Sequence, residues 1–116
     1  GTANISCTRI RCADGEPIAV LSNLMPASIA PTLEELEAGG LYDLLRAKDI
    51  IPTTAKQVIG ARNATTREAE QLHERRRAAL LTATRITYDQ SGRVIEYGQH
   101  IYRASRYTFE TSLFSS

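Results

Sequence analysis

The chain has 116 residues, with 14 lysines and arginines against 13 aspartates and glutamates and a formal net charge of +1. This length allows a single domain with a core of its own. The balanced charge excludes nucleic-acid binding by these residues alone, which requires a strongly basic surface. The longest uncharged stretch, residues 17–33, is interrupted by prolines and polar residues, so it cannot form a continuous membrane span.

The two cysteines, Cys7 and Cys12, do not suggest a disulfide, because residues five apart in an extended segment point to opposite faces. A reducing compartment follows, and we expect a cytoplasmic protein with no membrane partner. Together with His73 and His100, the cysteines show no metal-ligand spacing. The sequence therefore predicts neither a metal site nor a cofactor.

Two β-like runs open the chain. Residues 2–12 alternate in polarity, and residues 18–25 are rich in aliphatic and β-branched side chains. The Asp-Gly-Glu-Pro sequence at 14–17 is a turn signal between them, and Pro26 ends the second run. The pattern predicts a β-hairpin.

A capping box predicts the first helix. Thr32 can accept a hydrogen bond from an early helix amide while Glu35 reaches back to the backbone. Leu33 and Leu36 would form the apolar face of this helix, and the glycines at 39 and 40 would end it. Leucines at helical spacing predict a second short helix over residues 41–48.

The next predicted elements are a strand over residues 53–61 and a helix that starts at a second capping box. In this box Thr65 is the cap and Glu68 the residue that reaches back. We expect the helix to continue to about residue 73 and to turn Ala69 and Leu72 inward.

Two long strands complete the chain, over residues 80–89 and 94–114, with a turn at 91–92. The last run is too long for one flat strand, so we expect a bend near Ala104 and Ser105. Hairpins at both ends and few helical crossovers indicate an α+β fold, with an antiparallel sheet flanked by short helices.

Arg9 and Arg11 are the first candidate binding residues. Their spacing puts both guanidinium groups on one face of a strand, where each can hold a phosphate or carboxylate by two hydrogen bonds. The structural alternative is a solvated sheet face or a salt bridge, with Glu16 or Glu96 as partner.

Glu96, His100 and Tyr102 share one face of the last strand. The carboxylate of Glu96 can accept hydrogen bonds from a polar ligand, and Tyr102 can stack on it and donate its hydroxyl proton. The structural alternatives are pairing of Glu96 with a nearby arginine and packing of Tyr102 in the sheet. For His100, packing or exposure is the commoner role.

Gly40 and Tyr42 lie at the expected start of the second helix, where backbone amides without helical partners attract anions. These two residues complete the set of candidate ligand-binding positions. The full set is Arg9, Arg11, Gly40, Tyr42, Glu96 and Tyr102.

Several strings, taken together and in order, resemble the UTRA domain, the effector-binding domain of the HutC subgroup of GntR-family transcriptional regulators. They are RIRCADGEPIA at 9–19, GLYDLL at 40–45, RITYD at 85–89, GRVIEY at 92–97 and YRASRYTFE at 102–110. The resemblance implies a chorismate-lyase-like α+β fold and a dimeric small-molecule sensor. It also implies that residues 1–116 are one such domain, without its first segment and without the winged helix-turn-helix domain that precedes it in the family.

The resemblance carries over to individual positions. In relatives that sense phosphosugars, residues matching Arg9 and Arg11 lie at the effector pocket, an acidic residue matching Glu96 faces it, and a tyrosine matches Tyr102. Two positions depart from the pattern. Gly40 stands where many members have a serine that helps hold phosphate, and Leu21 where relatives often have a glutamate that reads the ligand.

The leading hypothesis is a non-enzymatic sensing and homodimerisation domain of a bacterial regulator. It would bind a small anionic metabolite, such as a sugar phosphate or a carboxylate, and control operator DNA binding by the absent N-terminal domain. The first alternative is a small lyase on the same fold. The second is a dimerisation module whose pocket has lost its ligand, which Leu21 and Gly40 leave open.

Overall fold

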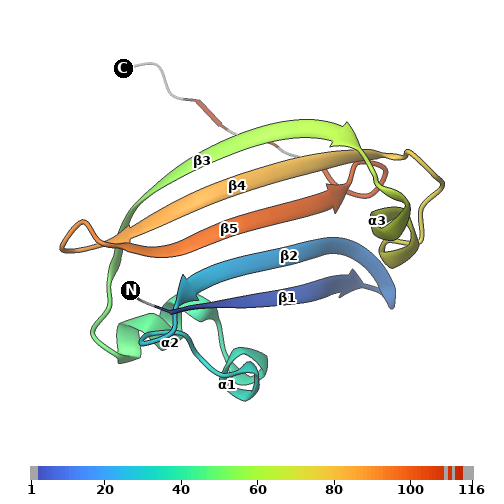
Figure 1. Cartoon of the computed structure of the whole chain (residues 1–116). Helices are drawn as coiled ribbons and strands as arrows, with labels where there is room; N and C mark the ends of the chain where they lie inside the picture. The colour runs from blue at the N-terminus through green and yellow to red at the C-terminus, as the bar shows by residue number, and fades with distance from the viewer. Residues whose placement is uncertain (1–2, 109, 111, 114–116) are drawn as a thin grey trace.

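The computed structural model describes residues 3–108, 110, 112 and 113. In these residues five antiparallel strands form one sheet in the order β1-β2-β5-β4-β3, with β5 at its centre (Figure 1). Three short helices flank the sheet, which confirms the predicted α+β fold. The elements in chain order are β1 (Asn4–Ala13), β2 (Glu16–Pro26), α1 (Leu33–Ala38), α2 (Leu41–Ala47), β3 (Pro52–Asn63), α3 (Thr66–Gln71), β4 (Ala79–Asp89) and β5 (Val94–Arg103).

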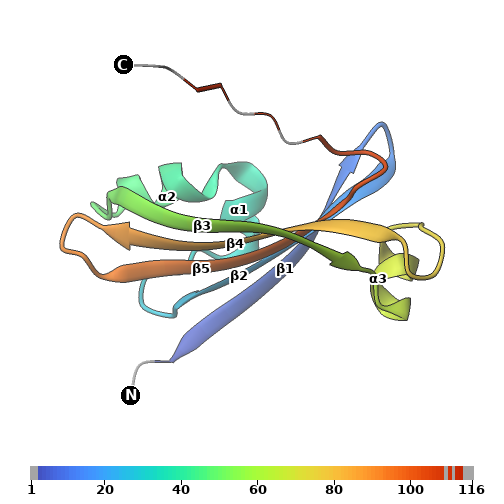
Figure 2. The same cartoon turned by 90° about the horizontal axis from the view of Figure 1, so that it is seen from above.

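The helices occupy opposite ends of the sheet, α1 and α2 at one end and α3 at the other (Figures 1 and 2). Each end has its own core, and the two cores use opposite faces of the sheet because neighbouring strand residues alternate in direction. At the α2 end the buried cluster is Met25, Ile29, Leu45 and Ile95. At the α3 end it is Val20, Ala64, Ala69, Leu72 and Leu80.

The hairpin turns form where the sequence predicts them. Asp14 and Gly15 connect β1 to β2 with φ angles of 52° and 79°. Two successive positive φ angles are typical of the type I′ turn, whose twist matches that of the strands. Between β4 and β5, the Asp89 carboxylate accepts hydrogen bonds from the amides of Ser91 and Arg93, at 2.8 and 2.9 Å. These turns fix the register of both hairpins.

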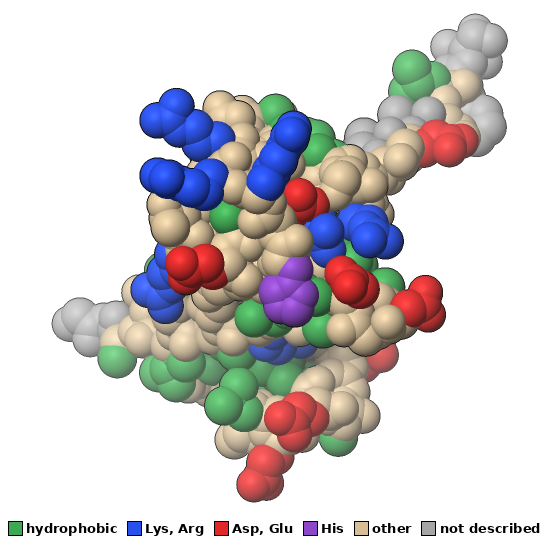
Figure 3. Space-filling model, turned by 90° about the vertical axis from the view of Figure 1, so that its right-hand side faces the viewer, with side chains coloured by type: hydrophobic (Ala, Val, Ile, Leu, Met, Phe, Trp, Pro, Cys, Tyr) green, Lys and Arg blue, Asp and Glu red, His purple; other side chains and the backbone are tan. Residues whose placement is uncertain are grey.

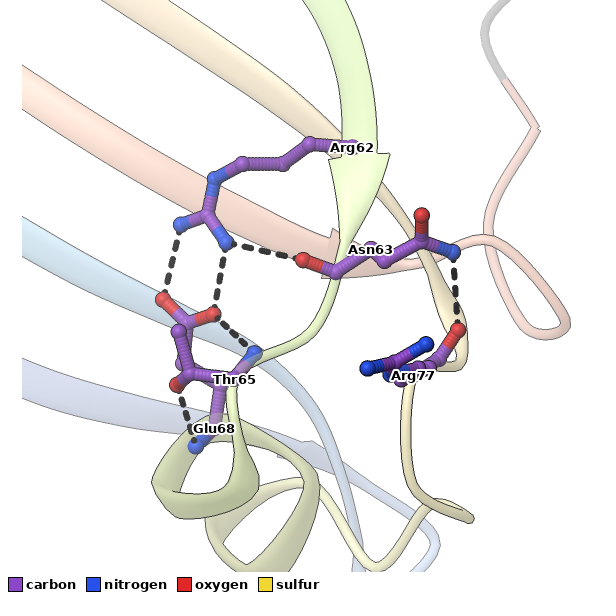
Figure 4. Close-up of polar contacts among 5 residues, drawn as sticks. All are labelled: Arg62, Asn63, Thr65, Glu68 and Arg77. Atoms are coloured by element: carbon purple, nitrogen blue, oxygen red, sulfur yellow. Dashed lines mark hydrogen bonds and ion pairs between the residues drawn. The ribbon is translucent and has the colours of Figure 1, made fainter.

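An ion pair joins the end of β3 to the start of α3 (Figure 4). The two terminal nitrogens of Arg62 donate to the two carboxylate oxygens of Glu68, at 2.6 and 2.7 Å. Glu68 also closes the predicted capping box with Thr65. These hydrogen bonds, that from Arg62 foremost, lower the pKa of Glu68 from 4.5 to about 2. The helix start is therefore fixed by charge as well as by capping.

A second ion cluster holds the end of the last strand. β5 ends at Arg103, and the chain turns over residues 104–106, where the bend near Ala104 and Ser105 was predicted. The described residues beyond this turn are not in a strand, in contrast to the predicted run to residue 114, of which residues 109, 111 and 114 lie outside the described residues. The buried Arg103 side chain donates to Glu74 at 2.8 Å, to Glu16 at 3.2 Å and to the carbonyl of Pro17 at 2.9 Å. Arg103 thus holds the end of β5 to the β1–β2 hairpin and to the loop after α3.

The first helix also differs from expectation. Its capping box forms as predicted, but Leu33 is 64% exposed and α1 contains no buried residue. Of its two leucines only Leu36 is partly buried, so this six-residue helix buries less apolar surface than its sequence predicts.

Candidate functional site

A cavity of about 480 Å³ lies between α2 and the sheet face formed by alternate residues of β1, β2, β4 and β5. Most of the residues that line it are charged or polar. Five of the six predicted binding residues lie in this wall, which the structure builds from distant parts of the sequence. The lining residues are Arg9, Arg11, Leu21, Asn23, Gly40, Leu41, Tyr42, Asp43, Arg46, Arg85, Glu96 and His100.

Arg9 and Arg11 reach the cavity from β1, at the edge of the sheet. In the register of the β1–β2 hairpin they lie opposite Leu21 and Ala19, respectively. Neither arginine forms an ion pair with another described residue, because Glu16 is taken by Arg103 and Glu96 accepts hydrogen bonds from uncharged side chains. The salt bridges considered as a structural alternative are therefore not formed.

Glu96 is buried at the floor of the cavity, with 3% of its surface exposed. Its carboxylate accepts hydrogen bonds from the side-chain amide of Asn23, from the hydroxyl of Thr87 at 3.0 Å and from the hydroxyl of Tyr42 at 3.2 Å. Arg85 donates to the same tyrosine oxygen at 3.0 Å. Tyr42 thus stands between the carboxylate and the arginine, so the two charges are linked without a direct ion pair.

The start of α2 contributes both Gly40 and Tyr42 to the cavity wall. Gly40 is the N-cap of α2 and makes no side-chain capping bond. A Cβ atom at this position would lie 3.7 Å from the Asp43 carboxylate, an ordinary van der Waals distance. The serine of related sequences would therefore fit here, and the glycine leaves the cavity mouth wider.

Tyr102 does not line the cavity, in contrast to its predicted place. It lies six residues beyond Glu96 on β5, about 20 Å along an extended chain, which is too far for one small pocket. Its ring stacks on Tyr107 with centroids 4.4 Å apart and borders a neighbouring hollow of about 120 Å³. Its hydroxyl lies 3.3 Å from Nδ1 of His100, so Tyr102 contacts a residue of the cavity wall from outside the cavity.

Sequence reasoning did not single out Asn23, Arg46 or Arg85, and it gave His100 a packing or exposed role. All four line the cavity. Asn23 and Arg85 lie directly opposite Gly98, on either side of β5. Only the strand register brings them together, and no local sequence pattern gives that register.

The cavity has more positive than negative charge. Its wall carries four arginines against Asp43 and Glu96, and Asp43 pairs with Arg46 at 3.3 Å. Three buried side-chain nitrogens have no hydrogen-bond partner within the described part of the chain: Nε of Arg9, Nε of Arg85 and Nε2 of His100. An unpartnered buried polar group costs about 1–3 kcal/mol. All three belong to residues of this one wall, so a bound acceptor would relieve that cost there.

The described residues contain no group of three or more histidine, cysteine or acidic side chains placed to hold a metal ion. None of their helices is long and apolar enough to cross a membrane.

Comparison with known families matches residues 1–108 to the model of the UTRA domain. The chain belongs to the UTRA domain family. This confirms the resemblance inferred from the sequence strings, and with it the effector-binding part of a GntR-family regulator.

Individual relatives of this UTRA domain agree. This chain is 36% identical over 104 residues to the HTH-type transcriptional repressor NagR of Bacillus subtilis, and the match spans 88% of this chain but only 43% of NagR. A crystal structure of a transcriptional regulator from Streptomyces coelicolor is 49% identical, with a TM-score of 0.84 over 89% of this chain and 69% of that one. A GntR-family regulator from Enterococcus faecalis is 29% identical, with a TM-score of 0.84 over 91% and 78%.

These relatives are transcriptional regulators and not enzymes, in agreement with the prediction of a non-enzymatic domain. The lyase alternative therefore has no support among them. The solved relatives also share the five-stranded antiparallel fold found here.

Proposed function

We propose that this UTRA domain senses a small anionic metabolite, which binds in the cavity between α2 and the sheet. The observation that carries the proposal is the set of buried, unpartnered nitrogens on Arg9, Arg85 and His100, all in one wall with excess positive charge. A phosphate or carboxylate group would accept hydrogen bonds from such donors. Glu96 and Asn23 would bind the uncharged polar part of the ligand.

The ligand exerts control in a longer protein. We infer that residues 1–116 form one sensor domain of a cytoplasmic homodimer, and that a winged helix-turn-helix domain outside this sequence binds operator DNA. The name of the repressor NagR, of which this chain spans less than half, supports that arrangement. Ligand binding would control DNA binding only if it favours one arrangement of the dimer over another.

Departures at Leu21 and Gly40 bear on which anion is bound. Leu21 is buried in the cavity wall and offers an apolar contact, where a glutamate would accept hydrogen bonds from an amine or a hydroxyl. The preferred ligand should therefore carry an aliphatic part next to its anionic group.

A thermal-shift screen with phosphorylated sugars, phosphonates, dicarboxylates and amino acids tests the proposal, with calorimetry on the hits. A ligand at 100 times its Kd stabilises the folded domain by about 2.7 kcal/mol, which raises the Tm by several degrees. The substitutions Arg9→Gln and Arg11→Gln should each weaken binding of a hit at least tenfold, by about 1.4 kcal/mol or more.

Arg76→Gln is the matched control, because Arg76 is an exposed arginine in the loop after α3. This variant should bind the hits as the wild type does. A hit whose binding survives both cavity substitutions would place the ligand elsewhere. A screen without any arginine-dependent hit would favour a dimerisation module with a vestigial pocket.

A further inference from the structure

His100 is the one imidazole in the cavity wall, and the function proposed above counts its unpartnered Nε2 among the groups that meet the anion without saying how this nitrogen comes to carry a proton. It lies on the central strand β5, between Leu21 of β2 and Ala83 of β4, and 9% of its surface is exposed. A histidine so placed cannot be a solvated surface residue. Its two ring nitrogens have different surroundings, and that difference suggests a function.

Nδ1 has a partner and Nε2 has none. Nδ1 lies 3.3 Å from the hydroxyl of Tyr102, whose ring is held in place by stacking on Tyr107. Nε2 is buried without a hydrogen bond to any described residue. A Cβ atom on Gly98 would lie only 3.2 Å from Nε2, tighter than an ordinary van der Waals contact, so the glycine leaves this nitrogen uncrowded. The ring thus has a hydrogen-bond partner at Nδ1 and none among the described residues at Nε2.

Positive charges dominate the surroundings of the ring. Arg9 and Arg11 face it from β1 and Arg85 from β4, whereas β2 contributes only the uncharged Leu21 and Asn23. The charged and titratable groups on the remaining elements are Glu96 and Tyr102 on β5 and Tyr42, Asp43 and Arg46 on α2. His100 also borders a separate hollow beside α3, whose charged residues are Arg62, Arg67 and Glu68.

These surroundings favour the neutral ring while the cavity holds no anion. Burial is the main cause that lowers the pKa of His100 below its usual 6.5, and the positive charge of Arg85 adds to it. Arg11 and Arg9 act in the same direction, and only Glu96 opposes them. In the neutral tautomer whose Nδ1–H donates to Tyr102, Nε2 carries a lone pair and lies buried beside Gly98.

We propose that His100 is a ligand-binding residue whose Nε2 takes up a proton from solvent as the anion binds and then donates it in a hydrogen bond to that anion. The proposal rests on the anion site proposed above and adds a residue and a pH dependence to it. The imidazolium ring keeps both N–H groups as donors, one to Tyr102 and one to the ligand. An anion in the cavity offsets the arginine charges, so the protonated ring becomes favourable only in the complex.

The sign of the pH effect follows from this linkage. The pKa of His100 is higher in the complex than in the free domain, so binding consumes a proton between the two values. Affinity is then highest below the free pKa, falls as the pH rises through the window, and levels off above the pKa of the complex. Carboxyl groups titrate mainly below pH 5 and contribute little to this window.

Sulfate is a suitable probe because it remains a dianion throughout this range, whereas phosphate changes its charge. Its Kd should be measured by NMR titration at constant ionic strength at several values between about pH 5.5 and 7.5, and we expect it to rise about three- to tenfold across that range. His100→Gln keeps a hydrogen-bonding side chain that does not titrate, so the Kd of this variant for sulfate should change by less than about twofold over the same pH range.

His73→Asn is the matched control. His73 is the only other histidine of the chain, is exposed, and has a positive φ that asparagine tolerates. This variant should keep the full pH dependence. In the wild type, sulfate should also move the titration midpoint of the His100 ring to higher pH, and the His73 signal provides an internal reference.

The outcomes separate this inference from the proposed function. Sulfate binding that is lost in Arg9→Gln but does not depend on pH, or a pH dependence that persists in His100→Gln, would overturn the role of His100 and leave the anion site standing. No arginine-dependent binding of sulfate at any pH would overturn both.

Discussion

The two ends of the sheet use arginine side chains in opposite ways. At the α3 end the arginines that hold the fold are paired, Arg62 with Glu68 and Arg103 with Glu74 and Glu16. The surface at that end shows basic and acidic side chains next to one another (Figure 3). At the α2 end Arg9 and Arg85 each keep a buried nitrogen without a partner among the described residues.

The difference distinguishes charges that stabilise the domain from charges that bind. A paired arginine has already satisfied its hydrogen bonds, so it can hold elements together but has little left to offer a ligand. An unpaired arginine in a cavity can bind a ligand, but it leaves the free domain less stable than it could be. Substitutions at the two ends should therefore separate stability from binding.

The largest effect is expected at Arg103. Arg103→Met keeps most of the side-chain volume but removes the donor to Glu16 and to the carbonyl of Pro17, and leaves Glu74 with the hydroxyl of Ser105 alone. Breaking a buried ion pair in this way should lower the free energy of unfolding by about 2–4 kcal/mol. Urea denaturation followed by circular dichroism measures the change.

Arg106→Met is the control for this substitution, because Arg106 lies three residues further on and is exposed. Its unfolding free energy should change by less than about 0.5 kcal/mol. If the two variants were equally stable, the paired end would owe its stability to packing alone, and the contrast between the ends would not hold.

A smaller effect is expected at Glu68. Glu68→Gln retains a side chain that can close the capping box, but it removes the charge that pairs with Arg62. The partner Arg62 is 45% exposed, so solvent weakens the pair and we expect a loss of about 1 kcal/mol at neutral pH. The control is Glu70→Gln, an exposed glutamate of the same helix.

The pH dependence sharpens this prediction. The pKa of Glu68 is lowered from 4.5 to about 2 in the folded domain, mainly by Arg62. Its contribution is therefore complete above the unfolded pKa and is lost as the pH falls from 4.5 towards 2. Denaturation curves should show this loss in the wild type and in Glu70→Gln, and a weaker pH dependence in Glu68→Gln.

The fold could be predicted from the sequence largely because its signals are local. The Asp-Gly turn and the capping boxes of Thr32 and Thr65 each act within four residues, and each forms as expected. The sequence also predicts the bend after β5, but not the contacts that hold it there. These are made by Arg103, whose partners Glu74 and Glu16 lie 29 and 87 residues away in the chain.

The site could be predicted only in part for the same reason. Alternation along single strands placed Arg9, Arg11 and Glu96 on the face that lines the cavity, and the expected start of the second helix added Gly40 and Tyr42. Asn23 and Arg85 enter the cavity through strand register. Tyr102 has the same parity as Glu96, but parity gives the face of a strand and not the position along it. Whether these residues bind the ligand stays a prediction.

The smallest effect on stability, and the one that tests the contrast from the other side, is expected at Arg9. Arg9→Gln removes a charge that has no ion-pair partner among the described residues and that shares a cavity wall with Arg11 and Arg85. Like charges repel, so the unfolding free energy should change by less than about 0.5 kcal/mol or increase slightly. The same variant should lose at least about tenfold in affinity for a ligand of the cavity. A loss of stability comparable to that of Arg103→Met would mean that Arg9 holds the fold, and then unpaired nitrogens would no longer mark the binding end of the domain.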